Sequence, residues 1–185
     1  MTKLSPPVGP DDHTHGPGDA KITLVEFGDY ASPRSRAVIA TIQQVLDELG
    51  DELCFAYRHF PNTDASPFAM TAAEAAESVA RHGGERAFWA MHGILYLNQD
   101  ALQHDDLIEY ARAVGVEPIL VADDLACGAM RDRVRRDARS AVRSGARSAP
   151  VFFVNGCRFD GDLDDPAAFV AALLDKTDGR AYTTH

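Results

Sequence analysis

Strand-like sequence occurs near both ends of this 185-residue chain, and the long stretch between them has helical patterning. Residues from about 21 to 28 form a nearly continuous apolar run, which predicts a strand buried on both faces. An amphipathic helix is expected over about 33–49, stopped by Gly50, and a second strand follows at 53–60. A strand, helix and strand in this order predict two parallel strands joined by a right-handed crossover.

The rest of the chain completes an α/β pattern. Residues from about 66 to 146 indicate several successive helices. Strand character returns at 150–156, where the pair Asn155-Gly156 is typical of a tight turn into another short strand. A last helix is expected over 166–174. The predicted fold class is therefore α/β, with the order β-α-β, a long helical insertion, and then β-β-α.

The domain organisation follows from this order. The length suits one domain that carries a large insertion. We expect an α/β domain made of residues 20–62 and 147–175, and an all-helical insertion at 63–146. Residues 1–19 are rich in Pro, Gly, Asp and His, which predicts an irregular lead-in, and 176–185 form a polar tail.

Charge and hydropathy restrict the partners. A formal net charge of −10 argues against nucleic acid or an anionic membrane as the main partner. No apolar run approaches the roughly 20 residues that span a bilayer. The first residues lack the apolar core of a signal peptide, so the sequence predicts a cytoplasmic protein.

Cysteines and histidines give no sign of a metal centre. Cys54, Cys127 and Cys157 are far apart in sequence, and we expect free thiols that mostly serve packing. His59 and His92 have no partner at the spacing of metal ligands, which favours structural roles. We therefore predict no metal and no cofactor, and the sequence gives no oligomeric state.

The segment Ser32-Pro33-Arg34-Ser35 lies at the predicted strand-to-helix junction. Serine is a preferred N-cap and proline a preferred first-turn residue, so helix capping is the simplest interpretation of these residue types. The same place presents free backbone N–H groups, which favour an anion such as a ligand's thiolate. A hydroxyl at position 32 could donate a hydrogen bond to that sulfur.

Arginines recur every fourth residue in the last predicted helix of the insertion. This spacing makes a slowly winding stripe that leads toward Pro150. The stripe either attracts an anionic ligand or is a solvated face balanced by Asp132 and Asp137, and the second interpretation is the simpler. Its members are Arg131, Arg135, Arg139, Arg143 and Arg147.

The element order and five motifs resemble the DsbA-like branch of the thioredoxin superfamily, over about residues 8–175. That resemblance implies a thioredoxin fold interrupted by a helical insertion. The motifs are Val-Glu-Phe-Gly-Asp-Tyr at 25–30, the turn at 32–35, Tyr-Arg-His-Phe-Pro at 57–61, Phe-Trp-x-Met-His at 88–92, and Ser-Ala-Pro-Val-Phe-Phe-Val-Asn-Gly at 148–156.

The resemblance also implies roles for single positions. The family's nucleophilic cysteine would stand at Ser32 and its resolving partner at Ser35. Pro150 would be the cis-proline facing the site, and Glu26 the buried acid beneath it. Disulfide exchange needs a thiolate that attacks sulfur, and a serine hydroxyl cannot replace it. The resemblance therefore implies the architecture of an oxidoreductase without its usual chemistry.

The sequence leaves three functions open. In the first, the protein keeps a groove for an extended peptide or a small thiol, with no redox activity. Ser32 and Ser35 would form the site with Glu26 beneath it. The ligand-binding residues would be Pro33, Arg34, Arg147, Ala149 and Pro150.

The other two functions are enzymatic. The turn is also similar to the S-P-Y-S motif of kappa-class glutathione transferases and hydroxychromene-carboxylate isomerases, although Arg34 replaces the aromatic residue. That likeness implies glutathione as a substrate, with Ser32 stabilising its thiolate. Alternatively, the chain is a thiol-disulfide oxidoreductase whose two cysteines were replaced by serine.

Overall fold

The structure is a computed structural model that describes residues 2–163 and 165–175, so the predicted tail at 176–185 lies outside the described residues. The strands are β1 (His13–His15), β2 (Ile22–Gly28), β3 (Leu53–His59), β4 (Val151–Val154) and β5 (Cys157–Phe159). The helices are α1 (Pro33–Ala37), α2 (Ile39–Leu49), the short 3-10 helix η1 (Gly50–Glu52), α3 (Ala69–Leu97), α4 (His104–Ala113), α5 (Pro118–Cys127), α6 (Arg131–Arg143) and α7 (Pro166–Asp175).

The five strands form one mixed sheet in the order β1-β3-β2-β4-β5. β2 and β3 are parallel, as the strand-helix-strand pattern predicts, and the other neighbours are antiparallel. Asn155 and Gly156 both have positive φ in the turn between β4 and β5, which confirms the predicted hairpin. The fold class predicted from the sequence is correct.

Alternating residues divide the sheet into two buried faces. On one face, side chains such as Leu24, Phe55 and Phe152 belong to the main core together with α2 and α7. On the other, Val25, Phe27 and Phe153 pack with Ala141 and Ala146, in and just after α6. The central strands are therefore covered on both sides, which explains their continuous apolar sequence.

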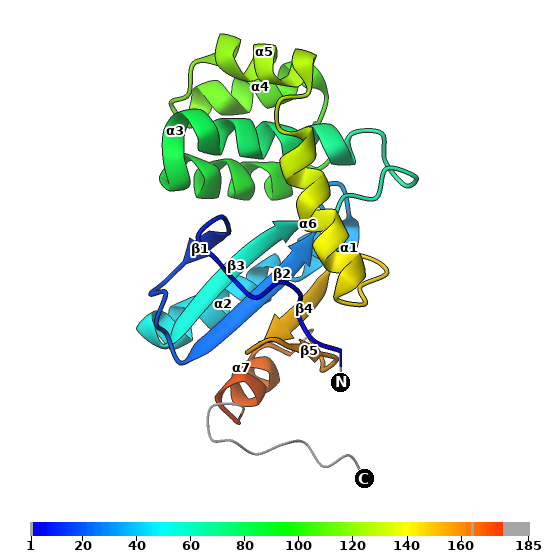
Figure 1. The fold of residues 1–185 in the computed structure, drawn as a ribbon. Helices are drawn as coiled ribbons and strands as arrows, with labels where there is room; N and C mark the ends of the chain where they lie inside the picture. Colours follow the sequence, from blue (N-terminus) through cyan, green and yellow to red (C-terminus); the bar gives the residue numbers. More distant parts are fainter. Residues whose placement is uncertain (1, 164, 176–185) are drawn as a thin grey trace.

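The helical insertion stands at one end of the sheet, and α6 returns from it along the sheet toward β4 (Figure 1). Phe88, Met91 and Leu95 of α3 belong to the same apolar core as the sheet residues. We interpret the insertion and the α/β part as sharing one core. Gly84 has non-helical backbone angles, so α3 is two helical segments joined at a kink.

Two sequence-based expectations need correction. The helix expected over 33–49 is broken at Val38, whose ψ of −5° takes the chain out of regular helix between α1 and α2. The lead-in at 1–19 contains a short strand, because His13–His15 pairs antiparallel with β3 at the sheet edge. Gly50 ends α2 with a positive φ, as expected.

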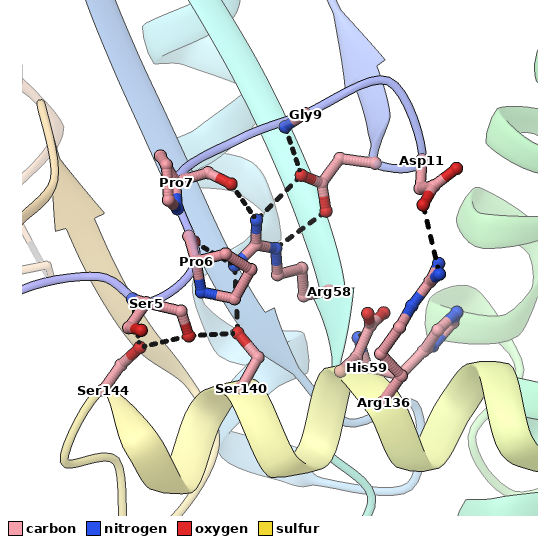
Figure 2. Close-up of polar contacts among 12 residues, drawn as sticks. Ser5, Pro6, Pro7, Gly9, Asp11, Arg58, His59, Arg136, Ser140 and Ser144 are labelled. Atoms are coloured by element: carbon pink, nitrogen blue, oxygen red, sulfur yellow. Dashed lines mark hydrogen bonds and ion pairs between the residues drawn. The ribbon is translucent and has the colours of Figure 1, made fainter.

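Arg58 fastens the N-terminal segment to the sheet (Figure 2). Its Nε and Nη2 donate to the two carboxylate oxygens of Asp12, at 2.7 and 2.8 Å. The remaining hydrogen bonds go to the carbonyls of Pro6 and Pro7 and to Ser140 Oγ, at 3.0–3.1 Å. All five guanidinium donors are thus used in a side chain that is 2% exposed, which makes this segment an integral part of the fold.

Candidate functional site

The Ser32–Ser35 turn is a helix cap in the structure. Ser32 has extended backbone angles, and its Oγ accepts a hydrogen bond from the Ser35 N–H at 3.4 Å. Ser35 is fully buried, and its Oγ accepts from the Asp29 N–H at 3.3 Å. Both hydroxyls therefore hold the local backbone. Ser32 is half-buried, whereas Pro33 and Arg34 are exposed, so a ligand can reach the first three positions of the turn.

Asp29 connects this turn to the segment after β3. Its carboxylate accepts hydrogen bonds from the Ala31 N–H at 2.9 Å and the Asn62 N–H at 3.0 Å. Burial raises the pKa of this carboxyl group, and the two backbone hydrogen bonds and the nearby His59 oppose that rise. Asp29 thus fixes how the chain leaves β2 for the turn.

Gln99 attaches the turn to the helical insertion. Its side-chain amide donates to the carbonyl of Tyr30 at 2.8 Å and to the carbonyl of Ser32 at 2.9 Å. These contacts join segments 67 and 69 residues apart in the chain. No pattern near Gln99 indicated the contact, because a single amide in a loop after a helix has no periodic signal.

The Pro150 loop lies at the same end of the sheet as the serine turn, because β4 begins beside the point where β2 ends. Phe27 pairs with Val151 across the β2–β4 ladder, so continuing the register places Pro150 opposite Gly28. The Ala149–Pro150 peptide bond is cis, and both residues are half-buried, while Arg147 is exposed. The structure therefore brings the serine turn and the Ala149–Pro150 loop to the same end of the sheet. Their roles stay predictions.

Glu26 is a buried acid in the middle of β2. It is 0% exposed, and neither carboxyl oxygen has a hydrogen-bond partner among the described residues. Its strand neighbours are Tyr57 on β3 and Phe152 on β4. Burial raises its pKa from 4.5 to about 8, so the carboxyl group holds its proton at neutral pH.

Three tyrosines near this acid and one histidine form a network of neutral polar groups. The hydroxyls of Tyr57 and Tyr96 lie 3.0 Å apart, and the Tyr30 hydroxyl lies 3.1 Å from His92 Nδ1. Burial, together with the charges of His59 and His13, lowers the pKa of His92 to about 3. The imidazole is therefore neutral. Its contact with the Tyr30 hydroxyl indicates a structural role for His92.

A second buried cluster joins the sheet to the insertion. Glu77 of α3 contacts His59 Nε2 at 3.0 Å and His13 Nε2 at 3.2 Å. Burial alone would raise the pKa of Glu77, but hydrogen bonds from the two histidines and the charge of Arg133 lower it strongly. Sequence analysis missed this cluster, although a glutamate within an alanine-rich buried helix was a usable signal.

The second cluster also includes a possible ligand set for a cation. Atoms of His59, Glu77 and Asp137 lie within 4.8 Å of one another. The guanidinium of Arg133 forms ion pairs with both carboxylates. Since Arg133 already pairs with both carboxylates, we interpret these residues as an internal ion cluster that links β3 to α3 and α6.

The arginine stripe divides into two parts. Arg131 pairs with Glu74 at 2.7 Å, so this member has a structural partner. Asp137, expected to balance the stripe, instead points into the core and pairs with Arg133. Arg135, Arg139 and Arg143 stay exposed on one flank of α6.

The three cysteines are unpaired, and none belongs to the serine turn. Cys54 is buried in β3, as expected. Cys157 is half-buried, because it lies in β5 beside β4 and its backbone forms a bridge with Lys3. Within the described part of the chain, no helix is both long and apolar enough to cross a membrane.

Comparisons with known proteins agree with this architecture. The sequence profile of the thioredoxin family matches residues 9–175, and the chain belongs to that family. Among solved structures, oxidised BdbD from Bacillus subtilis superposes with a TM-score of 0.79 at 22% identity, covering 91% of this chain and 94% of that one. Reduced DsbA from Mycobacterium tuberculosis gives 0.69 at 19% identity, covering 89% and 91%. The fold is therefore DsbA-like, as the resemblance implied.

A curated relative has a different description. The Na(+)/H(+) antiporter NhaA 3 of Salinispora tropica is 35% identical over 185 aligned residues, which covers 96% of this chain but 28% of the antiporter. The chain spans little more than a quarter of the length of the first curated relatives that it matches.

Proposed function

We propose that this protein is a DsbA-like binding module without disulfide chemistry, and that it holds an extended peptide between the serine turn and the Pro150 loop. The observation that carries the proposal is that Ser32 and Ser35 both serve as caps in an intact turn. The backbone of the site is maintained while no thiol is present in it. Disulfide exchange requires such a thiol.

The surroundings support binding. Pro150 lies just before β4, at the same end of the sheet as Ser32, and both residues are partly accessible. Gln99 and Asp29 fix the opposite side of the site through backbone contacts. A site that is fixed before binding loses less conformational entropy when a peptide docks.

Binding is tested with an insulin B chain whose thiols are blocked by iodoacetamide, titrated calorimetrically. We expect saturable binding that Arg147→Ala weakens, with Arg86→Ala on α3 as an exposed control. Reduced glutathione is titrated in parallel and should give no heat beyond dilution. The proposal is wrong if the blocked peptide does not bind or if both variants bind it equally well.

A glutathione-dependent transferase or isomerase is the second candidate. The favouring observation is that the half-buried Ser32 accepts only a long hydrogen bond, at 3.4 Å, which leaves its O–H available to donate to a thiolate. Saturable glutathione binding that Ser32→Ala weakens would replace the first proposal with this one. Electrophilic substrates would then be screened.

The third candidate is an oxidoreductase whose cysteines were replaced. The double variant Ser32→Cys, Ser35→Cys tests it by insulin reduction. A gain of activity would show that the retained Glu26 and Pro150 still support exchange. No gain in the folded double variant would favour the binding module.

The antiporter relatives bear on context. The segment that they share with this chain is its thioredoxin-family part, about a quarter of their length. We infer that in those proteins the segment is an accessory binding module.

For this chain we also infer a cytoplasmic location, which three unpaired cysteines support. Alkylation of the thiols in intact cells, followed by fractionation, tests this location.

A further inference from the structure

The outer flank of α6 carries an open hollow of about 440 Å³. Its floor is apolar and includes Phe60, Ala138 and Val142, and Val142 is 64% exposed. Its remaining lining residues are Arg135, Arg139 and Arg143, one from each successive turn of the helix. The hollow therefore combines an accessible apolar floor with a cationic border.

The hollow lies at the functional end of the sheet. The Phe60 N–H donates to the Gly28 carbonyl at 2.7 Å, which fixes Phe60 at the point where β2 leads to the serine turn. The N-terminal segment follows another flank of α6, where it contacts Arg136, Ser140 and Ser144 (Figure 2). This segment therefore leaves the flank with the hollow open.

The charge of the border is not neutralised locally. Arg131, Arg133 and Arg136 of α6 form ion pairs with carboxylates. Within residues 2–163 and 165–175, the three border arginines have no ion pair. Neighbouring cations repel one another when no carboxylate pairs with them, so these arginines make a local positive patch on a chain of net charge −10.

We propose that this hollow binds an acidic segment of a partner protein, which inserts an apolar side chain between flanking carboxylates. The apolar side chain would cover Phe60 and Val142, and the carboxylates would pair with the border arginines, for which bidentate contacts are favourable. The hollow and the peptide site at the serine turn share no residues.

The probe is a fluorescein-labelled peptide of sequence Glu-Asp-Glu-Phe-Leu-Asp-Glu, followed by fluorescence anisotropy. Changing Phe-Leu to Gly-Gly should weaken binding about tenfold, since it removes the apolar burial. Raising the salt concentration from 50 to 300 mM should weaken binding as well, because exposed charges are screened.

The test variant is the triple Arg135→Ala, Arg139→Ala, Arg143→Ala. Each exposed ion pair contributes only modestly, so the triple variant should lose about tenfold in affinity. Alanine is a good helix former, and α6 should stay folded, which circular dichroism checks. The matched control is the triple Arg81→Ala, Arg86→Ala, Arg112→Ala, which removes the same charge from exposed positions on α3 and α4 and should change affinity less than about threefold.

The outcomes separate the two sites. Equal losses in both triple variants would overturn the proposal, because the probe would then respond to general positive charge. Equal binding of the Gly-Gly peptide would overturn the role of the apolar floor. Arginine-dependent binding to vesicles of phosphatidylcholine and phosphatidylglycerol (3:1), without peptide binding, would assign the surface to a membrane instead. Failure of the blocked insulin B chain to bind would refute only the proposed peptide site at the serine turn, and not the proposal for the hollow.

Discussion

Replacing Glu26 by glutamine should remove a pH-dependent loss of stability. The carboxyl group is 0% exposed without a hydrogen-bond partner among the described residues, and its pKa is raised to about 8. In the unfolded chain the same group titrates near 4.5. Between these two values the folded protein keeps a proton that the unfolded chain releases, so the free energy of unfolding falls as pH rises.

The magnitude follows from the width of that interval. Each pH unit lowers the free energy of unfolding by about 1.4 kcal/mol, and the full interval by about 5 kcal/mol. Glutamine has nearly the same shape and does not ionise. The stability of Glu26→Gln relative to the wild type should therefore rise by about 3 kcal/mol from pH 4.5 to pH 7.

The assay is urea denaturation followed by the fluorescence of Trp89, the single tryptophan, at pH 5, 6, 7 and 8. Taking the difference between variant and wild type at each pH cancels the histidines, which titrate in both proteins. Glu117→Gln, at an exposed glutamate, serves as the control and should give a flat difference. A flat difference for Glu26→Gln as well would refute the conclusion that this acid is buried and protonated.

Three further predictions concern the contacts that join distant segments. Arg58→Ala should lower the free energy of unfolding by about 3–5 kcal/mol in urea denaturation, because it leaves Asp12 buried without its cation. Gln99→Ala should cost about 1–2 kcal/mol and speed amide hydrogen exchange around Ser32, whereas unchanged exchange would exclude a clamping role. Burial alone would lower the pKa of His13, but Glu77 and Glu85 raise it. The contribution of His13 to the free energy of unfolding should therefore be complete below pH 6.5 and disappear at higher pH. In the same denaturation series, His13→Gln should lack this pH dependence.

Local sequence determined the elements and the form of the turn. The apolar runs of β2 and β3 predicted buried strands, and the Asn155-Gly156 pair predicted the hairpin. Ser32 before a proline predicted a capped helix, because both residues act on the backbone within a few positions of themselves. The break at Val38 was missed, since the apolar periodicity continues through it.

Tertiary structure decided which polar groups meet. Six arginines on α6 are chemically alike in the sequence, yet packing gave Arg131 and Arg133 carboxylate partners and left Arg139 on the border of a hollow. The clamp by Gln99 and the fastening of the N-terminal segment by Arg58 also join residues far apart in the chain. Helical periodicity gives the direction of a side chain around its own axis, whereas its partner depends on which other element packs against that direction.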